Sequence, residues 1–172
     1  MRELLSIGAI TRNDAAKTVC PTPLGRHLAQ LPCDARLGKL LVFGACLGCA
    51  HEAAALAGML VVRGPRPQPE HLAARRAYRL DKQGPLRSGG GKSDHCFLAS
   101  LLTDYSPRKA GALEGMGFSP DMMNEARRMR DQQLEALNRL GFTTNTSSSS
   151  SAVPKSTRWY LLRAACVASF FL

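Results

Sequence analysis

The sequence has no apolar run of membrane-spanning length, few aromatic residues and no secretory signal. Its apolar stretches stop well short of the ~20 residues that a membrane span needs, and the N-terminal segment MRELLSIGAITRND contains no signal-peptide core. Aromatic residues make up only 6% of the chain, which argues against a stand-alone module that reads bases by stacking. The six cysteines are scattered, so we expect reduced thiols and a cytoplasmic or nuclear protein with no membrane partner.

Acidic residues are scarce as well. Thirteen Asp and Glu residues oppose 23 Lys and Arg residues, which gives a net charge of +10. This surplus favours contact with a polyanion, most commonly nucleic acid, although acidic proteins and lipid surfaces are alternatives. The segment from Arg63 to Lys92 contains eight basic residues and two acidic ones, so most of the surplus lies there. A solvated helix face is the competing interpretation of that cluster.

The stretch from Thr22 to Val62 predicts the core. Thr22 suits a helix N-cap, and Pro23 suits the first helical position. Asp34 can cap a second helix, and a third is expected from Glu52 to Val62. The last two are apolar on nearly every side and too short to span a membrane. We therefore expect them at the centre of a helical bundle.

The remaining segments alternate between short elements and weakly patterned stretches. A short helix over 2–7 and a hairpin pairing 9–11 with 17–20 are expected first, and 63–69 reads as a linker. Further helices are expected over 70–83, from 93 or 94 to about 105, and from Ser119 to the stop at Gly141. A flexible loop is expected over 84–92, and 106–117 is Gly-rich and weakly patterned. The predicted buried face of the last helix is Met122, Ala126, Met129, Gln133, Leu137 and Leu140.

Four segments together resemble the helicase-associated region of DExH-box (DEAH-type) RNA helicases. They read TPLGRHLAQLP from Thr22, DARLGKLLVFGACLGC from Asp34, SDHCFLASL from Ser93 and FSPDMMNEARRMRDQQLEALNRLGF from Phe118. The resemblance covers roughly Leu4 to Phe142. It implies a mainly α fold: a truncated winged helix with a short β-hairpin over 1–33, and a ratchet-like helical bundle over 34–142. Residues 143–172 lie beyond it, and we expect this Ser-rich linker and apolar tail to be disordered, with a tail anchor as the less favoured interpretation.

The resemblance also implies a function. In this family, ATP hydrolysis in two RecA-like motor domains moves RNA past the ratchet bundle. No D-E-x-H or other motor motif occurs in the sequence, so we expect a fragment that grips RNA and, on its own, hydrolyses nothing. ATP and Mg²⁺ belong to the parent family, and no cofactor is expected in this chain. The expected partners are RNA and the motor domains. The alternative is a helical protein-interaction module whose basic face meets an acidic partner.

The candidate RNA-binding residues come from two sources. The basic segment supplies cations for phosphate contact, and the resemblance implies that Asp94, His95 and the Arg127–Arg130 face lie near the RNA channel. The full set is Arg75, Arg76, Arg79, Lys82, Lys92, Asp94, His95, Arg127 and Arg130.

Three other patterns carry less weight. Gly89-Gly90-Gly91-Lys92-Ser93 resembles a phosphate-binding loop, but the first glycine of that motif falls on Leu86 and no buried strand precedes it. Cys46 and Cys49 have C-x-x-C spacing, yet His95-Cys96 is the sole adjacent candidate for a second zinc pair. A redox pair of that type needs a βαβ setting, which is absent. The histidines show no arrangement for acid–base catalysis, so neither a metal site nor a catalytic residue is predicted.

Overall fold

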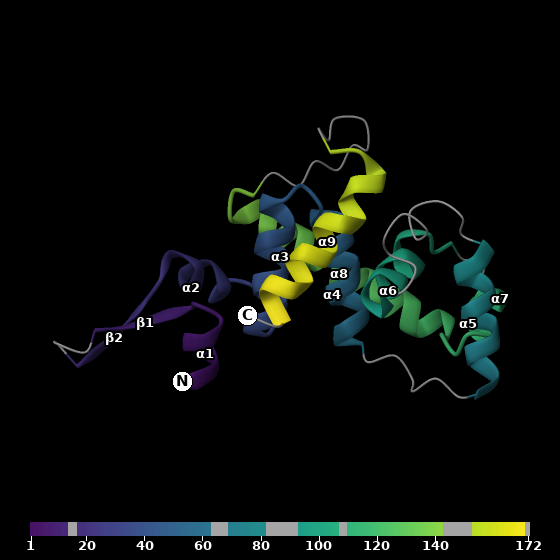
Figure 1. Ribbon diagram of the computed structural model, residues 1–172, viewed down its shortest axis with the longest axis horizontal. Helices are drawn as coiled ribbons and strands as arrows, with labels where there is room; N and C mark the ends of the chain where they lie inside the picture. The colour runs from purple at the N-terminus through teal and green to yellow at the C-terminus, as the bar shows by residue number, and fades with distance from the viewer. Residues whose placement is uncertain (14–16, 63–68, 82–92, 107–109, 143–152, 171–172) are drawn as a thin grey trace.

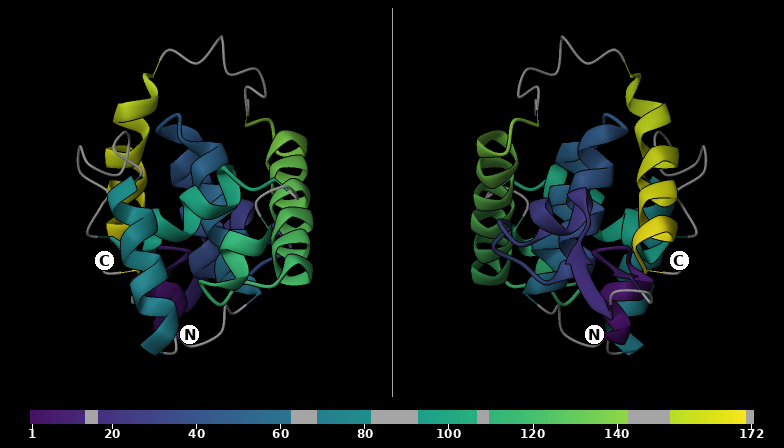
Figure 2. Two further views of the ribbon diagram at one scale, coloured as in Figure 1. Left: turned by 90° about the vertical axis from the view of Figure 1, so that its right-hand side faces the viewer. Right: turned by 90° about the vertical axis from the view of Figure 1, so that its left-hand side faces the viewer.

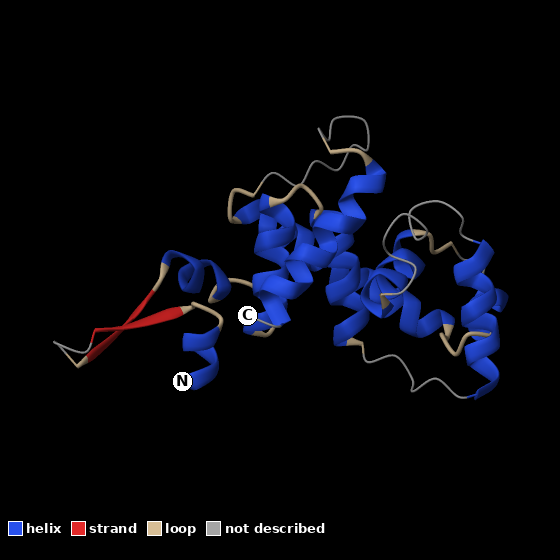
Figure 3. Ribbon diagram, in the orientation of Figure 1, coloured by secondary structure: helices blue, strands red, loops and turns tan. Residues whose placement is uncertain are grey.

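The computed structural model describes residues 1–13, 17–62, 69–81, 93–106, 110–142 and 153–170, except for the side chains of 78–81, 110 and 155. Within these ranges the chain is mainly helical, with one two-stranded antiparallel sheet, which confirms the predicted fold class (Figures 1 and 3). The elements in chain order are α1 (Arg2–Ser6), β1 (Ile10–Asn13), β2 (Thr18–Pro21), α2 (Pro23–Leu28), α3 (Ala35–Cys46), α4 (Ala50–Val61), α5 (Pro69–Asp81), α6 (Asp94–Thr103), α7 (Ala110–Glu114), α8 (Pro120–Arg139) and α9 (Lys155–Phe170).

The N-terminal unit is the predicted hairpin, flanked by α1 and α2. β1 pairs with β2 so that Ile10 lies opposite Pro21. Thr22 joins the hairpin to α2 in the N-cap position: its hydroxyl accepts a hydrogen bond from the Gly25 N–H at 3.0 Å. The Thr22 N–H donates to the Ala9 carbonyl at 2.9 Å, so one residue fixes both the strand pairing and the helix start.

Helices α3 and α4 form the centre of the bundle, as their apolar sequences predicted. Asp34 caps α3 by accepting hydrogen bonds from the N–H groups of Arg36 at 2.8 Å and Leu37 at 3.1 Å. Every residue of α4 from Glu52 to Met59 is buried. Burial on all sides requires neighbours all round, and α3, α6, α8 and α9 supply them.

Two glycines allow the central helices to approach closely. A Cβ at Gly44 of α3 would collide with the Cβ of Ala53 on α4. A Cβ at Gly58 of α4 would lie 2.5 Å from the carbonyl oxygen of Ala126 on α8. The α3–α4 and α4–α8 contacts therefore depend on the missing side chains at these two positions.

The buried face of α8 is wider than predicted and shifted. Ala126, Gln133 and Leu137 are buried as expected, but Met122, Met129 and Leu140 are only half-buried. Their predicted places are taken by Met123, Leu134 and Ala136. The reason is that α8 packs against α3, α4, α6 and α7, which together cover more of its circumference than one helix would.

The stretch over 106–117, whose weak pattern predicted no element, contains α7. This helix is too short to form alone, and its stability comes from packing. Leu113 and Met116 are buried in a cluster with Phe97, Phe118 and Met123. The Phe118 N–H also donates to the Leu113 carbonyl at 3.0 Å, which closes the turn into α8.

The expectation of a disordered C-terminal tail is wrong for residues 155–170. They form α9, which contacts α3, α4 and α6 and buries Trp159, Leu162, Ala165 and Cys166. Figure 2 shows α9 and α8 on opposite sides of α3 and α4. The apolar tail folds because the bundle leaves a face open to it. The serine run lies outside the described residues, and no described helix is both long and apolar enough to cross a bilayer.

Candidate functional site

Arg75 links the basic helix α5 to the start of α8. Its Nε donates to the Met116 carbonyl at 2.9 Å, and its guanidinium carbon lies 4.6 Å from the centroid of the Phe118 ring. His71, one turn earlier, lies against Gly117, where a Cβ would come within 2.7 Å of its Nδ1. Arg75 is half-buried and serves this packing, so its RNA-binding role stays a prediction.

The rest of the predicted basic segment is placed only in part. Arg76 is exposed on α5. The backbone of Arg79 belongs to the same helix, but its side chain is not described. Lys82, Lys92 and the triple-glycine loop lie outside the described residues. The structure therefore locates one exposed cation, Arg76, from this segment.

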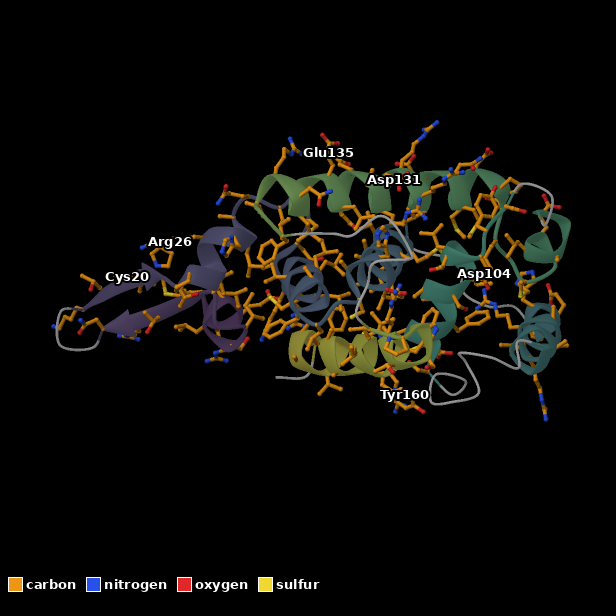
Figure 4. All side chains as sticks on the ribbon, turned by 90° about the horizontal axis from the view of Figure 1, so that it is seen from above. Cys20, Arg26, Asp104, Asp131, Glu135 and Tyr160 are labelled. Atoms are coloured by element: carbon orange, nitrogen blue, oxygen red, sulfur yellow. The ribbon has the colours of Figure 1, made fainter. Side chains whose placement is uncertain are left out.

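The predicted cations of α8 differ in their surroundings. Arg127 is exposed and makes no hydrogen bond or ion pair within the described part of the chain. Arg128 pairs with Glu125 at 3.5 Å, and half-buried Arg130 is held by Asp131 at 2.6 Å. Exposed pairs of this kind are weak and are screened by salt, so Arg128 can exchange its partner for a phosphate. Asp131 and Glu135 point outward from the same helix (Figure 4).

Asp94 and His95 lie at the start of α6, and His95 contacts α9. The His95 ring stacks on Phe170 of α9, with centroids 5.8 Å apart and planes inclined by 21°. Asp94 is exposed in the first turn of α6. α9, on which His95 stacks, and α8, which carries Arg127, cover opposite sides of the central helices (Figure 2).

Sequence reasoning missed a cleft at the C-terminal end of α8. It has a volume of about 290 Å³ and lies between the turn after α2 and the last turns of α8. Its lining consists of Gln30, Pro32, Gln132, Ala136, Arg139 and Leu140. No local pattern could have identified it, because its two walls are about a hundred residues apart in the chain.

The cysteines are poor nucleophiles where they are buried. Burial, reinforced by the Glu52 carboxylate, raises the pKa of the Cys49 thiol to about 12, whereas Cys46 in the same C-x-x-C motif is exposed. Burial likewise raises the pKa of Cys166 to about 12. Among the described residues, no three or more His, Cys, Asp or Glu side chains are grouped closely enough to hold a metal ion.

Comparison with known proteins identifies the region that this bundle represents. The family model described as helicase associated domain (HA2), ratchet-like, matches residues 34–98, which run from the cap of α3 into α6.

The individual relatives that match this chain are also RNA helicases. The DExH-box ATP-dependent RNA helicase DExH1 of Arabidopsis thaliana is 34% identical over 144 residues, covering 81% of this chain and 14% of the relative. The human ATP-dependent RNA helicase DHX29 is 41% identical over 147 residues, covering 69% of this chain and 10% of the relative. HrpA of Escherichia coli is 39% identical over 69 residues, covering 40% of this chain and 5% of the relative. The chain thus carries the helicase-associated, ratchet-like region of a DExH-box RNA helicase.

Proposed function

We propose that this chain grips single-stranded RNA for a DExH-box helicase whose RecA-like motor domains, with their ATP and Mg²⁺, lie outside it. The observation that carries the proposal is the match of α3 to α6 to the ratchet-like helicase-associated domain. The relatives are named as RNA helicases, and the chain spans only 14% of the first and 10% of the human one. On this proposal the chain alone binds RNA weakly and hydrolyses no ATP.

The proposal includes the N-terminal unit. Residues 1–33 would form a partial winged helix in front of the bundle. Ile7, Leu28 and Leu31 are buried in one apolar cluster with residues of α3, and this packing supports a fixed junction between the two parts.

Contact with the phosphate backbone is the chemistry that the exposed cations favour. Arg76, Arg127 and Arg128 are exposed, and each can neutralise one phosphate without reading a base. Each phosphate neutralised releases counterions. The logarithm of affinity should therefore fall with the logarithm of salt concentration, with a slope of about −0.7 per phosphate.

Salt-dependent binding of poly-U to the whole chain tests the proposal. Arg127→Ala should weaken binding and make the slope shallower by about 0.7, because one phosphate contact is lost. Arg2→Ala is the matched control, since it removes the same charge from an exposed position on α1 at the far end of the molecule (Figure 1). Absent or salt-independent binding would contradict RNA gripping and favour an acidic protein partner. Equal losses in both variants would point to non-specific charge attraction.

A further inference from the structure

The cleft at the end of α8 has the size of a small-ligand site. Gln132, Ala136 and Arg139 are spaced at i, i+4 and i+7, so they form one stripe along the helix, and Gln30 and Pro32 face them from the turn after α2. Its volume of about 290 Å³ lies at the lower end of the range seen for small-molecule pockets. One nucleotide-sized group fits such a space, whereas a packed peptide segment needs more room.

The lining combines apolar surface with amide groups. Pro32, Ala136 and Leu140 supply the apolar part. The Gln30 side-chain amide nitrogen donates to the Arg26 carbonyl at 3.0 Å, which orients the amide and leaves its oxygen as an acceptor. Gln132 makes no hydrogen bond with other described residues, so both its donor and its acceptor are available.

A single positive charge, Arg139, completes the lining. It forms no ion pair or hydrogen bond within the described ranges, and it is exposed. One guanidinium is too little for a polyphosphate site, which normally gathers several cations or backbone N–H groups. It is enough to pair with one phosphate of a strand.

These features together match one unstacked base with its phosphate. A base has flat apolar faces and an edge that carries both donors and acceptors, and proteins recognise single-stranded RNA through such splayed-out bases. A metal ion would need carboxylate, thiolate or imidazole ligands, and none lines the cleft. We infer that the cleft is a subsite for one base of single-stranded RNA, with Gln132 and Gln30 at the base edge and Arg139 at the adjacent phosphate. This inference rests on the proposed RNA-binding function and adds a base contact to it.

The surface next to the cleft offers the strand a continuation. Arg128 lies one helical turn before Gln132 and is exposed on the same side of α8. A strand leaving the subsite toward the start of α8 would therefore meet Arg128 next. Arg128 would contact phosphate only, so it serves as the matched comparison for the base-reading residues.

The test compares the full chain's affinity for an oligouridylate with its affinity for an oligomer of equal length that lacks the bases. The wild type should prefer the oligomer with bases. Gln132→Ala and the near-isosteric Gln132→Glu should each reduce that preference about fivefold, because both remove the amide donor at the base edge. Gln132 is exposed, and circular dichroism will verify that both variants are folded. Arg139→Ala and Arg128→Ala should weaken both oligomers alike and leave the preference unchanged.

The outcomes separate the two proposals. RNA binding in which both Gln132 variants keep the full preference would overturn the subsite and leave RNA gripping intact. Equal wild-type binding of the two oligomers would also overturn the subsite. If neither oligomer binds, the subsite and the proposed function both fail.

Discussion

Substituting Gly58 tests the contact between α4 and α8 on which the bundle depends. Gly58 lies within α4 where the backbone of α8 crosses it. The Cβ of an alanine would lie 2.5 Å from the Ala126 carbonyl oxygen and 3.3 Å from the Arg130 backbone nitrogen. Both neighbours are backbone atoms, so no side-chain rotation can relieve the clash. The two helices must move apart.

The magnitude follows from two opposing effects. Alanine is favoured over glycine inside a helix by roughly 0.5–1 kcal/mol. Forcing a methyl group into a filled helix contact costs about 1–3 kcal/mol. We therefore expect Gly58→Ala to lower the free energy of unfolding by about 1–2 kcal/mol. For a chain of this length, that corresponds to a fall in Tm of about 2–8 °C.

Urea and thermal unfolding followed by circular dichroism measure the change. Gly111→Ala is the matched control, because Gly111 lies in helix α7 and a Cβ there meets nothing within 4 Å. This variant should be as stable as the wild type or slightly more so. A Gly58→Ala protein as stable as the wild type would refute the close approach of α4 and α8. It would also refute the α8 orientation that places the cleft.

Three further predictions concern buried polar groups. Arg158→Met should lower the free energy of unfolding by about 3 kcal/mol in urea titrations, because Arg158 lies 3.6 Å from the buried Glu52 carboxylate and its loss leaves that charge unpaired. Adding Glu52→Gln should restore much of the lost stability. A double variant whose loss equals the sum of the two single losses would contradict the pairing. At neutral pH, iodoacetamide should modify Cys46 rapidly and spare Cys49 and Cys166. Burial raises these two pKa values from 9.0 to about 12, so the unfolded thiols ionise first as the pH rises. The stability that these thiols contribute should therefore be constant well below pH 9 and fall between pH 9 and 12, and a flat profile in that range would argue against burial.

Helix starts were the most predictable feature of this chain. Thr22, Asp34 and Ser119 were expected as N-caps, and each side chain accepts a hydrogen bond from a backbone N–H two or three residues later. Ser93 and Asp94 were alternative caps for α6, and the structure has Ser93 in that position. Gly141 likewise ends α8 with a φ of 85°, the left-handed conformation that favours glycine. These interactions join residues that are neighbours in the chain, so a short sequence window contains all the information they need.

The candidate site was less predictable, because its residues are assembled over long distances. The sequence grouped Arg75 with the other cations, but packing against Phe118 gives it a structural contact. His95 was expected near an RNA channel, and the structure adds a contact that the sequence did not indicate, because the His95 ring stacks on Phe170 of α9. The cleft between Gln30 and Gln132 has no local sequence signature.

The sequence by itself determined where α3 begins, that the central helices are buried, and which helicase region they resemble, since caps and apolar periodicity act within a few turns. The tertiary structure decided the rest. It ordered the apolar C-terminal segment as α9 because the side chains of Trp159 and Leu162 bury against a face that exists only once α3, α4 and α6 are assembled. It also formed the cleft, because only folding brings the turn after α2 to the end of α8.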